Sequence, residues 1–136
     1  MSNIKLSIRL VGDLPPEEII LNSVKTPFNL IRRGGKNIIG DIMDSDVLTI
    51  RLARWEDEKE ISDDYQFQLV IKSLTNMKPW LISLDKSRIN AEFYVGTVRT
   101  IDQGGFTLPS ELVAAISAAG LSLAVSILVV LDDDPG

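Results

Sequence analysis

The sequence predicts an α+β domain: an antiparallel or mixed sheet of about four to five strands, with helices packed on one face and ferredoxin-like connections. Three observations lead to this fold class. Apolar and polar residues alternate with a period of two, as in half-buried strands, over residues 3–11, 47–53 and 89–99. Prolines open two helices, at Pro15 and Pro109. The chain ends in an apolar strand, Leu123–Leu131.

Local patterns define the first strand and the first helix. The apolar positions of the strand Asn3–Val11 share one face, and they are Ile4, Leu6, Ile8 and Leu10. Pro15 and Pro16 set φ for a helix start, and two glutamates follow near the positive end of the helix dipole. We expect this helix to be short and to end near Ser23.

Residues 24–46 show no sustained period, because prolines and glycines interrupt the apolar pieces. We predict irregular structure here, with a strand at Ile38–Met43. The period of two returns in Val47–Ala53, which we predict to be a strand. Its buried face would carry Leu48, Ile50 and Leu52.

Residues 62–84 are predicted to be helical, with a strand as the alternative for their first part. Ser62 offers an N-cap, and acidic residues follow it. Helical spacing fits Phe67, Val70, Ile71, Leu74 and Met77, whereas a strand would use Phe67, Leu69 and Ile71. The longer window favours the helix. We expect Pro79 to end or kink it and to start a second, short helix.

The last third of the chain predicts a strand, a helix and a strand. Gly96 in the strand Ile89–Arg99 suggests a bulge or a bend. In the helix that starts at Pro109, Gly120 stands at the C′ position, where a positive φ is needed. The final strand is apolar at nearly every position, which is typical of a strand in the centre of a sheet.

Composition narrows the class of protein. The 136 residues predict one domain, with a disordered tail at Asp132–Gly136. No apolar run approaches the roughly 20 residues of a membrane helix, and the N-terminus lacks the apolar core of a signal peptide. We therefore expect a cytoplasmic protein without a membrane partner. The net charge of -5 disfavours nucleic acid, so the expected partner is a basic protein or a second copy of the chain.

The absence of Cys and His restricts the chemistry that the chain can perform. Without Cys there are no disulfides, thiolate nucleophiles or Cys-based zinc sites. Without His the commonest general base is missing, so catalysis would need carboxylates, Lys, Tyr or Ser. We expect no cofactor, no metal and no catalytic residue.

Two ends of the chain carry a family resemblance. The residues are Ser7–Ile19 (SIRLVGDLPPEEI), Phe106–Leu112 (FTLPSEL) and Ala118–Leu123 (AAGLSL). In these segments the chain resembles the bacterial domain-of-unknown-function family numbered 4279. The resemblance implies a bacterial protein of similar size and α+β organisation, and it implies no activity, cofactor or catalytic residue. Family members usually place a Trp inside the strand after the Gly-containing loop, whereas Trp55 is expected to follow its strand.

A basic, glycine-containing segment is the first candidate ligand site. Its residues are Arg32, Arg33, Gly34, Gly35 and Lys36. Glycines let backbone N–H groups converge on an anion, and the cations add charge. The spacing is not that of the phosphate loop G-x-x-x-x-G-K-[ST], and a mobile basic turn is the alternative.

Acidic residues form two further clusters. Asp41, Asp44 and Asp46 lack the closing Glu of a calcium loop, so we interpret them as a solvated turn, and Asp132-Asp133-Asp134 as a solubilising tail. The densest acidic run consists of Glu56, Asp57, Glu58, Glu60, Asp63 and Asp64. It is either a docking edge for a basic protein or a solvated loop and helix start.

The polar sides of the strands supply another candidate surface. If they share the uncovered face of the sheet, a mixed-charge platform forms from Lys5, Arg9, Thr49, Arg51, Asn90, Glu92, Tyr94 and Ser126. Such a face either meets water or serves as a binding or dimer surface. Tyr94 beside Arg9 or Arg51 would then be the anchor pair.

The sequence therefore favours a non-catalytic protein–protein interaction module. An immunity-like or regulatory protein that binds a basic partner through the acidic run or the open sheet face is one concrete form. The alternative is a small-molecule or anion-binding protein, or an enzyme, that uses Arg32–Lys36 as an anion clamp.

Overall fold

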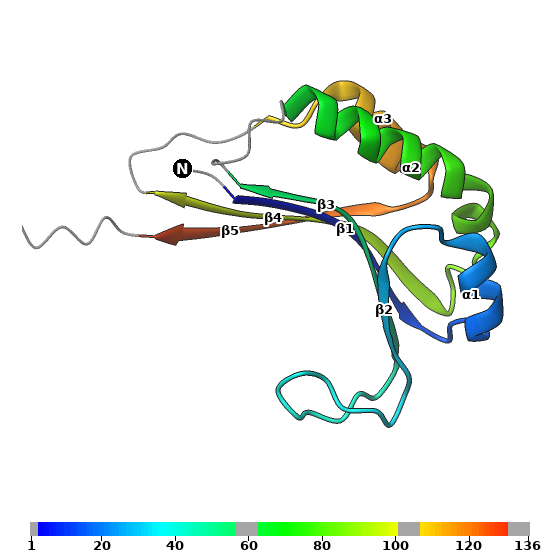
Figure 1. Ribbon diagram of the computed structural model, residues 1–136. Helices are drawn as coiled ribbons and strands as arrows, with labels where there is room; N and C mark the ends of the chain where they lie inside the picture. The colour runs from blue at the N-terminus through cyan, green and yellow to red at the C-terminus, as the bar shows by residue number, and fades with distance from the viewer. Residues whose placement is uncertain (1–2, 57–62, 101–106, 131–136) are drawn as a thin grey trace, which may run out of the picture.

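The computed structural model describes residues 3–56, 63–100 and 107–130. These residues form one sheet with α2 and α3 lying over one of its faces (Figure 1). In chain order the elements are β1 (Asn3–Gly12), α1 (Glu17–Ser23), β2 (Phe28–Ile31), β3 (Asp46–Glu56), α2 (Asp63–Ser83), β4 (Ile89–Thr100), α3 (Ser110–Ala118) and β5 (Ser122–Val130). The predicted α+β class is confirmed.

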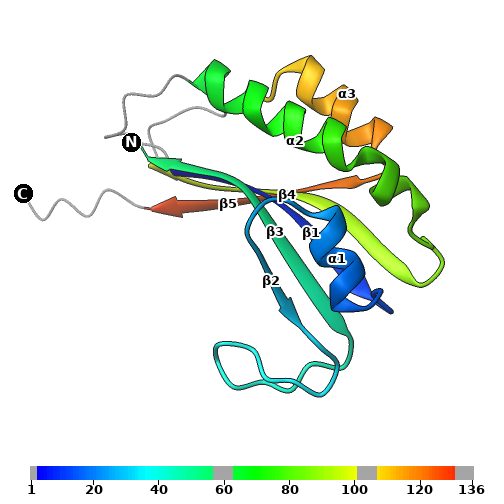
Figure 2. The same cartoon turned by 45° about the vertical axis from the view of Figure 1, so that its right-hand side comes forward.

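The strands of the described residues follow the order β2-β3-β1-β4-β5. β1 lies between β3 and β4 and is antiparallel to both, and β2 is antiparallel to β3. β5 pairs with β4 in parallel, because α3 carries the chain back between these two strands (Figure 2). The prediction of an antiparallel or mixed sheet with helices on one face is confirmed.

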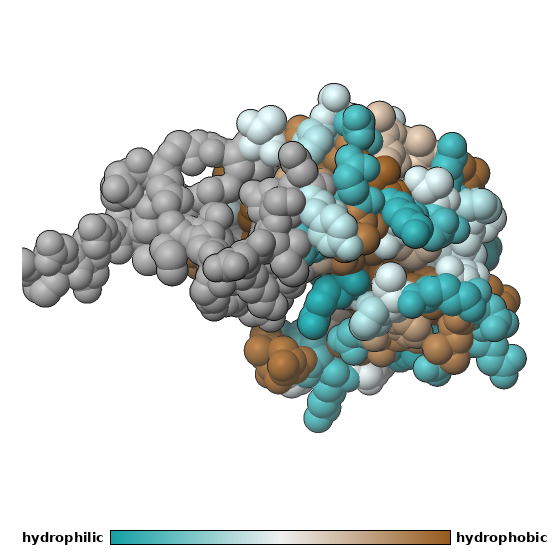
Figure 3. All heavy atoms as spheres, turned by 45° about the horizontal axis from the view of Figure 1, so that its top comes forward, coloured by the Kyte–Doolittle hydropathy of each residue, from teal (hydrophilic) through white to brown (hydrophobic). Residues whose placement is uncertain are grey.

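The hydrophobic core fills the space between the sheet and the helices. β1 runs through its centre, since every second side chain from Ile4 to Leu10 is buried. The largest fully buried side chains are Phe93, Leu6, Ile8, Leu10, Ile20, Leu48, Ile50, Leu74, Leu81, Leu112, Val70 and Val95. Seen from the helix side, the surface outside this core mixes polar and apolar side chains (Figure 3).

A β-bulge at Leu52 shifts the phase of β3 against β1. Leu6 is opposite Ala53 while Ser7 is opposite Arg51, so Leu52 is skipped in the register. The predicted buried positions of β3 are therefore correct only up to the bulge; beyond it Ala53 is buried, and Leu52 is half-buried at the edge of the core. Bulges increase the local twist of a sheet. Figure 1 shows β3 turning away from β4 and β5 together with β2.

β3 also extends further than its period of two predicts. It ends at Glu56, because β1 offers it a partner as far as Asn3. Trp55 consequently lies inside the strand, opposite Ile4. The expectation that Trp55 follows its strand is therefore wrong.

The prediction for residues 24–46 is wrong in two respects. A short strand, β2, lies at Phe28–Ile31, and it is too short for its period to show in the sequence. Ile38–Met43 is not a strand and makes only an isolated bridge between Lys36 and Ile42. β2 forms because β3 supplies its backbone partners and because Phe28 packs against the core. The segment 38–43 instead makes its backbone bonds to residues 34–37 of the same loop.

The helical prediction for residues 67–77 is confirmed, but the break at Pro79 is wrong. α2 continues through Pro79 to Ser83. Proline removes one backbone donor from the helix ladder. Met77 and Leu81, on either side of it, are both buried in the core, and their burial favours continuation of the helix past the proline. Tertiary packing therefore outweighs the local cost of the proline.

The end of α3 is confirmed, whereas the position of the last strand is not. Gly120 has a φ of +76°, the Leu121 N–H donates to Ile116 O at 3.2 Å, and the Gly120 N–H donates to Ser117 O at 3.0 Å. These bonds are the two bonds of a Schellman motif. The following strand, β5, lies at the edge of the sheet and not in its centre. Its apolar run does not reflect burial, since Leu123 and Val125 are 45% and 47% exposed.

Asp46 ties the first residues of β3 to two distant turns. Its Oδ2 accepts bonds from the Leu14 N–H (3.2 Å) and from Arg32 Nη1 (3.1 Å), and its Oδ1 accepts from the Arg33 N–H (2.8 Å). Burial raises the pKa of Asp46, but the two backbone N–H groups and the guanidinium outweigh it and lower the pKa below its ordinary value. Asp46 is therefore a structural clamp and not part of a solvated turn.

We expect Asp46→Asn to lower the free energy of unfolding by about 1–3 kcal/mol at neutral pH, because three donors lose their charged acceptor. A depressed pKa in the folded state stabilises the fold above the ordinary carboxyl pKa, and this stabilisation is lost as the pH falls through the folded-state pKa. The difference between wild type and variant should therefore shrink in acid. Urea unfolding at pH 7 and pH 3 measures it, with Asp44→Asn at an exposed neighbour as the control. An equal decrease in the free energy of unfolding for both variants would contradict the structural role of Asp46.

Candidate functional site

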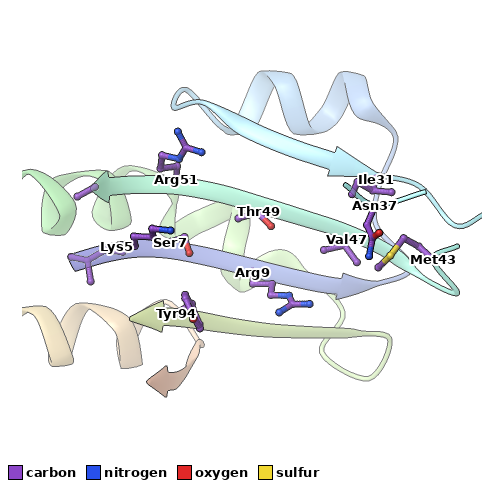
Figure 4. Close-up of a pocket in the computed structure, with 12 residues that line it drawn as sticks. Lys5, Ser7, Arg9, Ile31, Asn37, Met43, Val47, Thr49, Arg51 and Tyr94 are labelled. Carbon is purple, nitrogen blue, oxygen red and sulfur yellow. The ribbon is translucent and has the colours of Figure 1, made fainter. Parts of the chain in front are cut away.

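The face of the sheet that lies away from the helices is hollowed. The hollow has a volume of about 420 Å³ and opens to solvent on the side shown in Figure 4. It is lined by Lys5, Leu6, Ser7, Arg9, Ile31, Asn37, Met43, Val47, Thr49, Arg51, Ala53 and Tyr94. β1 and β3 form its floor, Tyr94 of β4 stands on one side, and the loop 32–45 borders the other end (Figure 4).

Strand register places three cations along the floor of this hollow. Arg51, Ser7 and Tyr94 form one row across β3, β1 and β4. Arg9 lies in the next row and Lys5 in the row on the other side, because alternate residues of β1 share a face. Neighbouring strands are about 4.8 Å apart and successive rows about 7 Å apart. Lys5 and Arg9 are therefore about 14 Å apart along β1, and Arg51 lies on the neighbouring strand between their rows.

Tyr94 shapes the wall of the hollow, and Gly96 makes room for it. A Cβ at Gly96 would approach the Tyr94 ring to 3.0 Å, so the absent side chain lets the ring lie along the strand. The β1–β4 register runs through Gly96 without a shift, so the predicted bulge there is wrong. Glu92 is opposite Arg9 and moderates the positive charge at that end of β4, although it does not line the hollow.

The other end of the hollow is apolar, and a tied loop forms it. Ile31, Val47 and Met43 gather there, with the Asn37 amide among them (Figure 4). Two backbone bonds hold Met43 in place: the Gly34 N–H donates to its carbonyl, and its own N–H donates to Gly35 O, both at 2.8 Å. The loop is therefore an ordered wall, with a cationic end of the hollow facing an apolar one.

The tip of this loop exposes apolar side chains to solvent. Ile38, Ile39 and Ile42 are all exposed, and Ile38 is completely so. Asn37 stabilises the tip, because its side-chain oxygen accepts bonds from the N–H groups of Ile39 (3.1 Å) and Asp41 (2.9 Å). The isoleucines stand beside the apolar end of the hollow without lining it.

The polar strand positions that the sequence predicts do share the open face. Five of them line the hollow: Lys5, Arg9, Thr49, Arg51 and Tyr94. Asn90 and Glu92 lie on the same face outside it, and Ser126 borders a neighbouring shallow hollow. Among the residues that the sequence missed, Ser7 has the same period-two phase as Lys5 and could have been found. No sequence pattern indicated Asn37 and Met43 as lining residues, because the path of a loop brings them to the hollow.

The Arg32–Lys36 segment is not arranged as an anion clamp. Arg32 donates to Asp46, to Leu14 O at 3.3 Å and to Pro15 O at 2.7 Å. The Gly34 and Gly35 N–H groups donate to carbonyls of their own loop. Three of the five groups that an anion would use are therefore engaged, and only the side chains of Arg33 and Lys36 extend to solvent.

The remaining acidic candidates are only partly visible in the described residues. Glu56 ends β3, and Asp63 and Asp64 begin α2. Asp57, Glu58 and Glu60 lie outside the described residues, as does the tail Asp132–Gly136. Within the described ranges, no group of three or more acidic side chains is placed to hold a metal ion. The acidic docking edge remains a prediction.

Comparisons with known proteins add no functional information. The family models, the curated proteins and the solved structures to which the chain was compared gave no match. The resemblance to family 4279 accordingly stays a prediction. In the part of the chain that the structure describes, no helix combines the length and the apolar character needed to cross a membrane.

We expect Arg32→Ala to lower the free energy of unfolding by about 1–3 kcal/mol, because it leaves the Asp46 carboxylate and two carbonyls without their donor. Arg33→Ala removes the same charge from an exposed side chain and should change the stability by no more than about 0.5 kcal/mol. Thermal and urea unfolding of both variants measure this difference. An Arg33 variant as unstable as the Arg32 variant would show that charge, and not the hydrogen bonds, carries the effect.

Proposed function

We propose that the protein is a non-catalytic binding module whose open sheet face binds an organic anion with an apolar tail. The observation that carries this proposal is the hollow itself, in which Lys5, Arg9 and Arg51 lie along the floor and apolar side chains gather where the loop 32–45 borders it (Figure 4). Its volume of about 420 Å³ falls in the range of small-molecule sites, which is roughly 300–1,000 Å³.

The charge distribution supports an anionic ligand. The whole chain has a net charge of -5, yet none of the described residues that line the hollow is acidic. A cleft lined by one sign of charge attracts ligands of the other sign. The hydroxyls of Ser7, Thr49 and Tyr94 stand among the cations and can donate further hydrogen bonds to oxygens of the ligand.

The apolar end supports a ligand that is more than a bare inorganic ion. Ile31, Met43 and Val47 offer surface that gains from contact with hydrocarbon. Met43 is well suited to irregular apolar groups, because its side chain is unbranched and flexible. A carboxylate at the cationic end with a hydrocarbon chain toward the loop 32–45 would satisfy both ends.

Binding fits the lining better than catalysis does. None of the described lining residues is acidic, so Lys5, Ser7 and Tyr94, whose residue types can take part in catalysis, have no carboxylate in the lining to serve as a general base. This proposal takes up the alternative that the sequence left open, an anion-binding protein, and places its site on the open face instead of at Arg32–Lys36. A basic partner on the acidic run Glu56–Asp64 remains a separate, untested hypothesis.

We also propose that β1 to β4 follow ferredoxin-like connections. The order of the strands supports this, since β1 and β2 are joined through α1 while β3 lies between them, and β3 returns through α2 to β4 on the far side of β1. α3 and β5 would then be an addition at the β4 edge.

We expect octanoate to bind in the hollow and the double variant Arg9→Ala, Arg51→Ala to bind it at least tenfold more weakly, because charge-assisted hydrogen bonds to the carboxylate are lost. Titration of the isotope-labelled full chain, followed by amide NMR shifts, gives both the affinity and the location. Lys72→Ala, Lys78→Ala on the exposed side of α2 is the charge-matched control and should bind as wild type does. Octanol tests the contribution of the hydrocarbon chain without the charge, and inorganic sulfate tests the contribution of the charge without the chain. Undiminished binding by the arginine variant would refute the proposal.

We expect affinity to rise from butanoate to hexanoate to octanoate by about two- to fourfold per methylene, as each group leaves water. Met43→Ser should flatten this series, because it removes apolar surface at the tail end of the hollow. Leu128→Ser, at an exposed position outside the hollow, should leave the series unchanged. The same NMR titration measures all three proteins. If affinity rises as steeply with chain length in the Met43 variant as in wild type, the hydrocarbon tail of the ligand does not contact Met43.

A further inference from the structure

β5 presents a free and apolar edge. It pairs with β4 on one side over nine residues, Ser122–Val130, and among the described residues no strand pairs with its other side. The helix-covered side of the strand exposes Leu123, Val125 and Ile127 at 45%, 47% and 51%, and the open side exposes Leu128 at 62%. Both the backbone edge and the side chains therefore lack a partner.

This edge has none of the usual protection against pairing. Natural edge strands carry charged residues, prolines or bulges, or they are very short. Ser122–Val130 contains no charged residue and no proline, and its register with β4 runs without a shift. The opposite edge of the sheet, β2, has only four residues. β5 is thus the edge of this sheet that is built to accept another strand.

α3 adds a second apolar element beside β5. Glu111 marks the side of α3 that faces α2, because its carboxylate accepts a bond from Gln68 at 3.2 Å. Val113 is two residues further on, about 200° around the helix, and so lies on the opposite side. α3 contacts β5, so that opposite side is the one toward the free edge, and Val113 is exposed there.

We propose that a second copy of this chain pairs with β5 in antiparallel orientation, about a two-fold axis near Val125. In this register Val125 is opposite itself, Leu123 is opposite Ile127 of the other copy, and Ala124 is opposite Ser126. Antiparallel neighbours share a face, so apolar side chains meet on the helix side and small side chains on the open side. The two sheets become one sheet, and the two α3 helices lie side by side above the junction.

Self-complementarity favours a second copy over a different protein. A two-fold contact joins the same patch on both chains, and an uncharged strand can face itself without repulsion. A basic partner would find no carboxylate on Ser122–Val130 to attract it. The contact also closes, because both β5 edges are used and only the two short β2 edges remain. The two hollows would open on the same side of the joined sheet.

Sedimentation of the full chain over a range of concentrations tests the proposal. We expect a dimer in wild type, and Val125→Lys should raise its dissociation constant at least tenfold, because two ammonium groups would meet at the axis. Leu69→Lys on α2 makes the same change at similar exposure, 42% against 47%, and should leave the dimer intact. Added salt should not weaken the dimer, since apolar contacts and backbone bonds hold it while the chains repel through their net charge.

Cysteine cross-linking locates the contact independently of the charge variants. The chain has no Cys, so a single Val125→Cys introduces the only thiol, and a short bis-maleimide should join two copies of it. Asn29→Cys on the other sheet edge, where the side chain is exposed, is the control and should remain uncross-linked. A wild-type monomer at all concentrations, a Val125→Lys dimer as strong as wild type, or preferential cross-linking of the Asn29 variant would each overturn the proposal.

Discussion

The alternation of β1 is the constraint on which the rest of the structure depends. β1 lies between β3 and β4, so its side chains decide what both faces of the sheet contain at their centre. Leu6, Ile8 and Leu10 are fully buried beneath the helices, while Lys5 and Arg9 emerge on the open face. A slip of one residue would bury the cations and expose the apolar row. The same alternation therefore secures the core and creates the cationic surface.

The hollow on the open face needs two further features besides this alternation. The bulge at Leu52 follows Arg51, the last β3 residue of the open face in the hollow, and moves the next buried position to Ala53. The Asp46 clamp holds the turn that contains Arg32 and Arg33 against the start of β3, which fixes both ends of the loop that borders the hollow. Arg32 thus contributes to the site by ordering its wall, since its own guanidinium is occupied.

The two proposals concern different parts of the same sheet and do not depend on each other. Ligand binding uses the middle strands and the loop 32–45, whereas dimerisation uses β5 and the outer side of α3. Loss of the dimer would leave the floor of the hollow, on β1 and β3, unchanged.

Several elements follow from local sequence patterns alone. The period of two in residues 3–11 and 89–99, the helix over Phe67–Met77 and the glycine stop at Gly120 depend on neighbours a few residues away. The sequence also placed Arg9, Arg51 and Tyr94 on one face, because a strand's period fixes which residues share a side.

Other features depend on partners that are distant in the sequence, and only the tertiary structure decides them. β2 forms because β3 supplies its backbone hydrogen bonds. α2 continues through Pro79 because residues on both sides of the proline are buried. The Arg32 guanidinium is bound to Asp46 because the fold brings these two residues together. The edge position of β5 belongs to the same group: an apolar strand has the same sequence whether it faces a neighbouring strand or solvent, and only the order of the strands separates the two cases.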